Sequence, residues 1–210
     1  MNARLLIVAA TSKEAEALGC SKAHVIVSGI GRTNAAAATT SALLEEGPFD
    51  GALSVGIAGA LPGSMLQPGD MVVASACMYV EEGLQTPTGF LDTAAMGFPL
   101  GDFAGNSVPT EPRLTAFLPG PLHRGVIATV ATCSGTDALA AEVERRTGAL
   151  AEAMEGAAVV HAAHRLGIPG GEVRVISNST GDRERQRWDM ARAMAAMHAL
   201  GARLEATARG

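Results

Sequence analysis

The sequence predicts an α/β fold with three layers (αβα) and a central mixed, mostly parallel β-sheet, formed by residues 1–210 as a single domain. Short apolar segments of strand length alternate with helical segments, which is typical of a parallel sheet covered by helices on both faces. The chain has 210 residues, enough for one α/β domain with a full core. Because hydrophobic residues make up 48% of the chain and aromatic residues only 3%, the core is expected to consist of aliphatic side chains that let helices pack closely on the sheet.

The first half of the chain contains four predicted strands and two predicted helices. Apolar residues predict strands at residues 4–9, 23–27, 51–57 and 70–79. Helices are expected at residues 11–18 and from about residue 33 to residue 46, the second being rich in alanine. Thr11 or Ser12 is the expected N-cap of the first helix, because a hydroxyl oxygen accepts a hydrogen bond from a free N–H of the first turn.

The second half repeats the alternation after a long interruption. Residues 81–121 are rich in Gly, Pro, Thr and Phe and show no sustained period, so they are expected to form a long segment with little regular structure. A loop of this length inside a domain usually has a functional role. Strands are expected at residues 125–131 and 173–177, and helices at residues 137–147, 156–166 and 189–206.

Charge and composition disfavour several classes of protein. The net charge is −5 and no basic stripe with interleaved aromatic residues occurs, so nucleic acid is not an expected partner. No apolar segment approaches the roughly 20 residues that span a bilayer, and residues 1–10 lack the basic start and long apolar stretch of a secretory signal. The sequence therefore predicts a cytoplasmic protein with no membrane partner.

Cysteine and histidine positions give no sign of a metal site. Cys20, Cys77 and Cys133 are scattered and form no Cys-x-x-Cys motif, which indicates a reducing compartment and argues against disulfides or zinc. His161 and His164 lie three residues apart without a carboxylate at metal-ligand spacing, so they are expected to be packing or surface residues. Neither a metal nor an organic cofactor is expected.

Several polar or glycine-containing segments directly follow predicted strands, namely residues 28–31, 57–59 and 132–135, and Asn178. Ligands of open α/β sheets bind at the carboxyl ends of the strands, so these segments are expected to converge on one site. Within the first segment, Gly29-x-Gly31 could bind a phosphate at helix N-terminal amides, form a tight turn without a ligand, or shape a pocket wall. Dinucleotide binding is disfavoured, because Asn34 replaces the third glycine of that motif.

Two carboxylates and one amide are the strongest candidates for function. Glu14 follows the first strand near a helix start, Glu155 opens the helix of residues 156–166, and Asn178 ends a buried strand. Acids at helix starts are also favoured by the helix dipole alone, and Asn is common in turns. Because a carboxylate can hold sugar hydroxyls and an amide can bind the edge of a base, the three residues together predict a nucleoside site.

These segments together resemble the purine nucleoside phosphorylase and methylthioadenosine nucleosidase superfamily. The matching segments are residues 7–18, residues 28–31, residues 54–73 (SVGIAGALPGSMLQPGDMVV) and residues 154–178. The Met154-Glu155 pair followed by VRVIS is fairly specific, whereas Gly-x-Gly alone is not. Within the superfamily the chain is most similar to the futalosine hydrolases, nucleosidases of menaquinone biosynthesis, through residues 82–92, 132–136, 152–158 and 176–183.

The resemblance implies a homo-oligomeric enzyme that hydrolyses futalosine to hypoxanthine and dehypoxanthinyl futalosine. It implies that Glu14 activates the attacking water as a catalytic residue, and that Glu155 with Met154 holds the ribose hydroxyls. The further substrate-binding residues that it implies are Ala58, Gly59 and Ser134. Residues 81–121 are expected to cover the benzoate-bearing end of the substrate, whose carboxylate should meet an arginine or a lysine that the sequence does not identify.

Asn178 stands where the adenine-specific nucleosidases of the superfamily carry an aspartate, and this difference indicates the base. Adenine offers a donor at its 6-amino group and an acceptor at N7, which a protonated aspartate can match. Hypoxanthine offers two acceptors, O6 and N7, which suit the NH2 group of an amide. Asn178 is therefore the second expected catalytic residue, because a hydrogen bond at N7 activates the departing base, and it predicts a 6-oxopurine substrate.

Two other enzymes and a binding protein remain as alternatives. A methylthioadenosine or S-adenosylhomocysteine nucleosidase is disfavoured by Asn178. A phosphorylase needs cations around phosphate, whereas residues 9–16 contain Glu14 and Glu16 and only one basic side chain, Lys13; Arg32 leaves this alternative open. A binding module of the same fold would bind a nucleoside without cleaving it.

Overall fold

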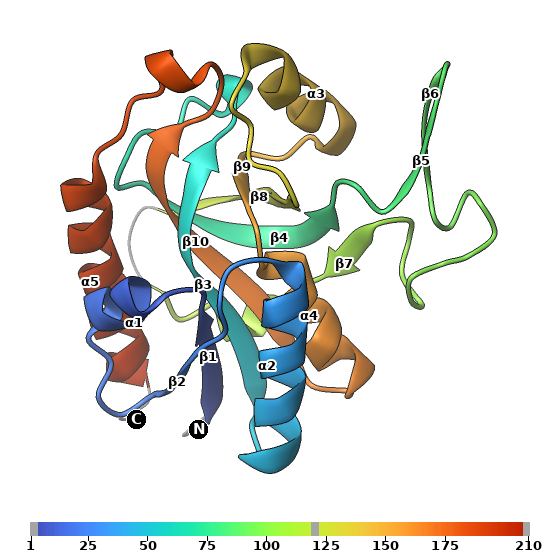
Figure 1. The fold of residues 1–210 in the computed structure, drawn as a ribbon. Coiled ribbons are helices and arrows are strands. Elements are labelled where there is room, and N and C mark those ends of the chain that lie inside the picture. Colours follow the sequence, from blue (N-terminus) through green and yellow to red (C-terminus); the bar gives the residue numbers. More distant parts are fainter. Residues whose placement is uncertain (1–3, 119–121, 208–210) are drawn as a thin grey trace.

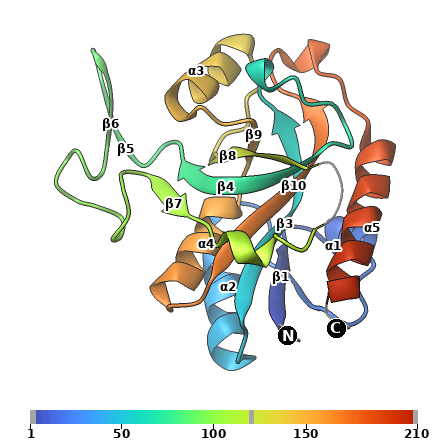
Figure 2. The same cartoon turned by 180° about the vertical axis from the view of Figure 1, so that it is seen from behind.

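The computed structural model describes residues 4–118 and 122–207, which form a sheet between two pairs of helices (Figures 1 and 2). The helices are α1 (Ser12–Leu18), α2 (Arg32–Glu45), α3 (Asp137–Thr147), α4 (Gly156–Arg165) and α5 (Met190–Thr207). Helices α1 and α5 pack against each other on one face, whereas α2 and α4 pack on the other. Every predicted helix is present, with ends within two residues of the prediction.

The central sheet is mixed and mostly parallel, as predicted. Its strands are β1 (Leu5–Ala9), β2 (His24–Val27), β3 (Gly51–Ala60), β4 (Met71–Tyr79), β7 (Ser107–Pro109), β8 (His123–Thr129), β9 (Ala151–Ala153) and β10 (Gly170–Ser179). Strands β1 and β2 extend one edge, and β10 pairs with β3 as well as with β4. The pairings β3–β10–β4–β8–β9–β3 therefore close into a ring, which draws the ends of these strands toward one another.

Alternation along the strands builds the three layers. In β1, Leu6 and Val8 pack into the core under α2 and α4, whereas Ile7 between them packs into the core under α5. In β10, Val175 and Ile176 divide between the same two cores. Successive side chains of a strand point to opposite faces, so strands that are apolar at nearly every position must be covered on both sides.

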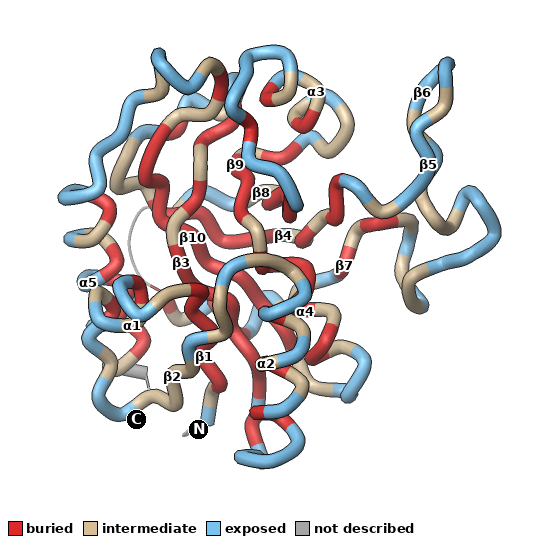
Figure 3. The backbone as a smooth tube through the Cα atoms, in the orientation of Figure 1, coloured by how far each residue is buried: buried red, intermediate tan, exposed pale blue. Residues whose placement is uncertain are grey.

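The prediction that residues 81–121 have little regular structure was wrong for three short stretches, which form strands. Strands β5 (Gly83–Thr86) and β6 (Gly89–Asp92) form an antiparallel hairpin, and β7 extends the main sheet by pairing with β4. The hairpin stands away from the body of the protein and is largely exposed (Figures 1 and 3). Because neither face of the hairpin is buried in a core, its sequence carries no alternation that could reveal it. Residues 119–121 of the segment lie outside the described residues.

Three strands near the predicted site differ from their predicted bounds. Residues 151–153, for which no strand was predicted, form the short strand β9. Strand β3 continues to Ala60, and β10 spans Gly170–Ser179, so Asn178 lies inside its strand rather than after it. The register of β10 against β3 shifts between Ile176 and Asn178, and such an irregularity re-aims the side chain that follows. Within residues 4–118 and 122–207, no helix combines the length and apolar character needed to cross a membrane.

Candidate active site

A pocket of about 670 Å³ lies where β1, β3, β9 and β10 meet the starts of α1, α4 and α5. Six of the seven predicted site residues line it: Glu14, Ala58, Gly59, Met154, Glu155 and Asn178. Ile30 and Cys133, from segments that follow strands, and Ile57, near the end of β3, also line it, so the pocket draws on several separate segments of the chain. The floor of the pocket consists of buried residues, among them Glu14, Glu155 and Asn178.

The Glu14 carboxylate is held by hydrogen bonds from two segments. Thr11 donates its backbone N–H and its hydroxyl to Oε2, at 3.0 and 2.8 Å, and its hydroxyl in turn caps the first turn of α1. The backbone N–H of Ile57 donates to Oε1 at 2.9 Å. The pairing of Thr11 and Glu14 is a capping box, so one local motif both starts the helix and aims the carboxylate at β3.

The Glu155 carboxylate joins the glycine turn to the floor of the pocket. Its Oε1 accepts a hydrogen bond from the backbone N–H of Gly31 at 3.0 Å, and its Oε2 lies 3.3 Å from Nη2 of Arg174. Gly31 has a φ of 91°, a conformation that other residues rarely adopt. Of the three possibilities for the glycine turn, its contact with Glu155 supports the shaping of a pocket wall.

Arg174 is a fully buried cation beside the pocket, and it was not among the predicted site residues. Its Nε lies 2.7 Å from Oε1 of Glu172, and its Nη2 donates to the Ser54 hydroxyl at 3.0 Å. Burial alone would lower the pKa of the guanidinium, but the carboxylates of Glu172, Glu155 and Glu14 raise it above its usual value. Arg174 is therefore a permanent positive charge that the surrounding carboxylates neutralise.

Glu172 completes this buried network, and its carboxylate occupies space that is free only because residue 156 is a glycine. Its Oε2 accepts a hydrogen bond from the thiol of Cys77 at 3.0 Å. A Cβ at Gly156, the first residue of α4, would lie 1.9 Å from the same oxygen. The sequence pattern Glu172-x-Arg174 could have revealed this buried ion pair. Residues two apart in a strand share a face, and charged residues in an apolar strand are rarely buried unless they are paired.

Asn178 presents an amide to the pocket. Its Oδ1 accepts a hydrogen bond from the Ser177 hydroxyl at 2.7 Å, and its Nδ2 donates to the backbone oxygen of Ser179 at 2.9 Å. Because an NH2 group has two hydrogens, these contacts leave one N–H of Asn178 available to a ligand within the described part of the chain. Gly59 lies directly opposite, and a Cβ there would come within 3.3 Å of Nδ2.

Ser134 was predicted to bind substrate but does not line the pocket. Its backbone N–H and hydroxyl donate to the two carboxylate oxygens of Glu152, at 2.7 and 2.6 Å. Glu152 lines the pocket and had not been predicted as a site residue. Burial raises the pKa of the Glu152 carboxyl, against the hydrogen bonds from Ser134, which lower it.

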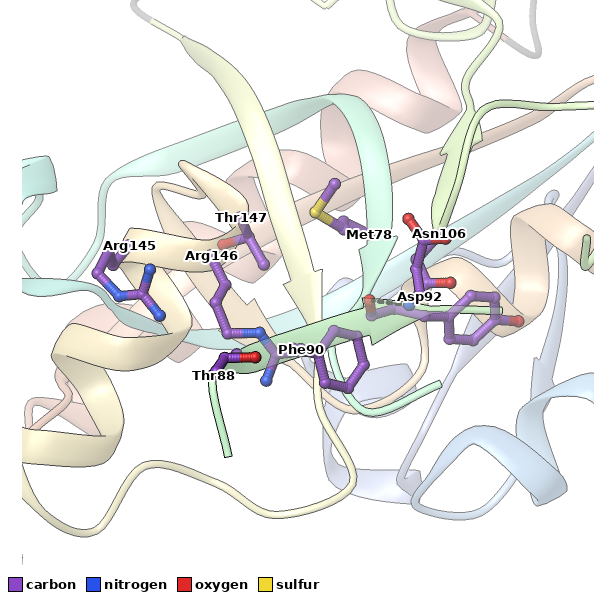
Figure 4. Close-up of a pocket in the computed structure, with 10 residues that line it drawn as sticks. Met78, Thr88, Phe90, Asp92, Asn106, Arg145, Arg146 and Thr147 are labelled. Atoms are coloured by element: carbon purple, nitrogen blue, oxygen red, sulfur yellow. Dashed lines mark hydrogen bonds between the residues drawn. The ribbon is translucent and has the colours of Figure 1, made fainter. Parts of the chain in front are cut away.

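The segment expected to cover the end of the substrate does not line this pocket. Among the described residues of the 81–121 segment, none belongs to the lining. The hairpin instead borders a second pocket of about 410 Å³ against α3, where the Arg146 guanidinium lies 3.7 Å from the centre of the Phe90 ring (Figure 4). There, Asn106 donates to the backbone oxygens of Tyr79 and Glu82, which anchors the base of the hairpin. None of the predicted site residues lies in this second pocket.

Comparison with known proteins places these observations in a family. Residues 15–207 match the model of the phosphorylase superfamily. The chain is 37% identical over 179 residues to a futalosine hydrolase of Streptomyces coelicolor, covering 82% of this chain and 74% of that protein. It is 37% identical over 180 residues to a futalosine hydrolase of Thermus thermophilus, with 80% and 75% covered. A futalosine hydrolase of Acidothermus cellulolyticus is 38% identical over 159 residues, which are 71% of this chain but less than two thirds (62%) of that relative.

Solved structures show the same fold at lower sequence identity. The native structure of futalosine hydrolase from Helicobacter pylori has a TM-score of 0.77 and 22% identity, and the likeness covers 100% of this chain and 98% of that one. A mutant of the Helicobacter pylori methylthioadenosine nucleosidase, with 5'-methylthioadenosine in its active site, also has a TM-score of 0.77, with 21% identity and coverage of 100% and 99%. The matched family model and the relatives at 37% identity show that this chain belongs to the phosphorylase superfamily and, within it, to the futalosine hydrolase family.

Proposed function

We propose that this protein hydrolyses the N-glycosidic bond of a 6-oxopurine nucleoside, and that its substrate is futalosine, which yields hypoxanthine and dehypoxanthinyl futalosine. The observation that carries the proposal is the meeting of Glu14, Glu155 and Asn178 at the floor of one pocket. Relatives named futalosine hydrolase, 37% identical over most of the chain, support this choice of substrate.

Glu14 and Glu155 divide the work on the sugar. Glu155 accepts hydrogen bonds from the ribose 2′ and 3′ hydroxyls, and its charge offsets the positive charge that develops on the sugar as the bond to the base breaks. Glu14 takes a proton from a water molecule, whose oxygen then bonds to the anomeric carbon. The pair of electrons of the broken C–N bond leaves with the base. Met154, beside Glu155, packs against the sugar.

Asn178 acts on the departing base. Its free N–H donates to N7 or O6 of hypoxanthine, both of which are acceptors, and this hydrogen bond stabilises the negative charge that the base gains. Ala58 and Gly59, on the strand that pairs with that of Asn178, line the pocket beside it, and a side chain at Gly59 would come within 3.3 Å of the Asn178 amide nitrogen. An adenine base would present its 6-amino donor at the same position and lose this match.

The charges around the pocket favour water over phosphate. Glu14, Glu152 and Glu155 line it, and they would repel an incoming phosphate dianion. The two nearest arginines are engaged elsewhere, since Arg174 pairs with Glu172 and Glu155, and Arg32 pairs with Glu81 and Glu82, which leaves Lys13 as the one basic side chain of the described lining against three carboxylates. This arrangement supports hydrolysis rather than phosphorolysis.

The proposal extends to the domain, the compartment and the oligomeric state in which the reaction takes place. Residues 1–210 act as one nucleoside phosphorylase-like domain, in the cytoplasm and in menaquinone biosynthesis. The protein works as a homo-oligomer, which the exposed apolar side chains Leu84, Leu91 and Phe98 around the hairpin support, because such side chains are commonly covered by a second subunit. Its substrate is a small nucleoside, and neither a metal nor an organic cofactor takes part in the reaction.

Chromatography of the released base tests the proposal. The purified protein is incubated with futalosine or with methylthioadenosine, each with and without phosphate. We expect hypoxanthine from futalosine at a rate independent of phosphate, and slower release of adenine. Faster adenine release would instead identify the methylthioadenosine nucleosidase activity. A sugar 1-phosphate formed only with phosphate present would identify a phosphorylase.

A further inference from the structure

The mouth of the pocket differs from its floor in both polarity and charge. Ile30, Trp188 and Met190 line the mouth and are 58%, 46% and 42% exposed, so an apolar shelf borders the opening. Lys13, exposed on the first turn of α1, lines the same pocket. It is the only basic residue among the described lining residues, whereas Glu14, Glu152 and Glu155 make the interior acidic.

Lys13 also differs from the nearby arginines, which are engaged in ion pairs or in contacts with other side chains. Arg174 is buried in ion pairs, and Arg32 lies 3.2 Å from Glu81 and 2.5 Å from Glu82. Arg183 stacks 4.8 Å from the centre of the Trp188 ring and donates to Gln186. Lys13 makes no hydrogen bond or ion pair with any residue that the structure describes, so its ammonium group is available to a ligand.

The direction of the substrate follows from the floor. Asn178 and Gly59 hold the base at the buried end, and Glu155 holds the 2′ and 3′ hydroxyls of the ribose. The 5′ substituent leaves the sugar on the side away from the base, and it therefore points toward the open mouth. Lys13 lines the same pocket as Glu14 but is exposed where Glu14 is buried, so it lies on the open side of the pocket.

We propose that Lys13 binds an anionic group at the far end of the 5′ substituent, and that Ile30, Trp188 and Met190 pack against the apolar part that precedes it. This inference rests on the proposed function, under which the anionic group is the benzoate carboxylate of futalosine. In a pocket lined by carboxylates, an anionic substituent needs a cation to offset repulsion, and Lys13 supplies it. Lys13 is thus a residue that determines substrate specificity without taking part in bond cleavage.

The test compares futalosine with its methyl ester, which keeps the shape of the substrate and removes its charge. The specificity constant kcat/KM is measured on both compounds for the unmodified protein and for Lys13→Met, Lys13→Arg and Lys22→Met. Lys22 is the other lysine of the chain and does not line the pocket, so Lys22→Met is a control for the loss of one positive charge.

We expect the unmodified protein to prefer the acid over the ester by about 10- to 100-fold, the range of a hydrogen bond between charged groups. Lys13→Met should abolish this preference, mainly through a higher KM for the acid. Lys13→Arg should keep most of it, and Lys22→Met should keep all of it. The preference should also shrink as ionic strength rises, because salt screens an exposed ion pair.

The possible failures are distinguishable. If the unmodified protein cleaves neither compound, the proposed function itself is wrong, and the role of Lys13 is wrong with it. If it cleaves futalosine but Lys13→Met keeps the preference for the acid, only the role of Lys13 is overturned. Arg183→Met is measured beside it, and a preference lost in that variant alone would assign the carboxylate to Arg183 instead.

Discussion

The floor and the mouth of the pocket differ in burial and in how their charged side chains are paired. At the floor, Glu14 and Glu155 are buried around Arg174, and each charge is fixed by hydrogen bonds or ion pairs from separate segments of the chain. At the mouth, Ile30 and Trp188 are exposed and Lys13 has no partner within the described residues. The comparison indicates that the floor positions the reacting groups, whereas the mouth selects what the nucleoside carries.

This difference has an energetic basis. A buried charge is tolerated only when opposite charges and hydrogen bonds compensate it, so removing one member of the floor network leaves the others uncompensated. An exposed cation at the mouth is solvated without a partner, so replacing it costs little stability. Substitutions at the floor should therefore change catalysis or folding strongly, and those at the mouth should change substrate preference.

The largest effect is expected for Glu14→Gln at the floor. The amide cannot take a proton from water, so kcat should fall by about 10²- to 10⁴-fold while nucleoside affinity changes little. Rates of base release and calorimetric binding of the substrate measure the two quantities. An unchanged kcat would remove Glu14 from the mechanism. A wild-type protein that binds the nucleoside and never cleaves it would instead be a binding module.

Arg174→Met should destabilise the fold by about 3–5 kcal/mol, because it leaves Glu172 buried without its counter-charge. Urea unfolding measures the change in the free energy of unfolding. Arg145→Met is the matched control, since Arg145 pairs with Glu142 at the exposed surface and should cost less than about 1 kcal/mol. Equal losses in both variants would contradict the distinction between buried and exposed pairs.

Asn178→Asp should shift base preference by about 1–3 kcal/mol, up to roughly a hundredfold, toward adenine. The measurement is the ratio of kcat/KM for futalosine and for its 6-amino analogue, which differ only in the base. Asn178→Ala serves as the comparison, because it removes the amide without offering a carboxylate. A ratio that Asn178→Asp leaves unchanged would show that this side chain does not contact the 6-position.

Glu152→Gln should produce the smallest effect, a change in how stability depends on pH. Burial raises the pKa of Glu152 in the folded protein above its usual value of 4.5, so the folded state binds this proton more tightly than the unfolded state. The free energy of unfolding should therefore fall, relative to Glu152→Gln, as the pH rises from 4.5 through the raised value. Urea unfolding at several pH values measures the difference in the free energy of unfolding between the two proteins. A wild-type protein that becomes more stable than the variant as the pH rises would contradict the raised pKa.

Apolar strands and local helix signals made most of the fold predictable. The apolar runs in β1 and β10 and the capping box at Thr11 and Glu14 are encoded within a few neighbouring residues. Strand β9 has only three residues, which is too short for a period to show. The β5–β6 hairpin buries neither face in a core, so it lacks the alternation that marks a half-buried strand.

The site was predictable where its residues form part of a motif and less so where they act through long-range contacts. Glu14 and Glu155 lie at the starts of helices and Asn178 lies near the end of strand β10, and all three line one pocket. The sequence did not show that Glu152 lines the pocket while Ser134 lies behind it. Their hydrogen bonds join segments 18 residues apart, and no local pattern reveals such a contact. Arg174 was hidden in a strand that otherwise resembles ordinary core, although a charged pair two residues apart was a usable signal.

A crystal structure of the Glu14→Gln variant with futalosine bound would test the division between floor and mouth most directly. We expect the hypoxanthine O6 or N7 within hydrogen-bond distance of the Asn178 amide, the ribose hydroxyls on Glu155, and the benzoate carboxylate near Lys13. A nucleoside bound in the second pocket beside Phe90, or bound with its base at the mouth and away from Asn178, would contradict it.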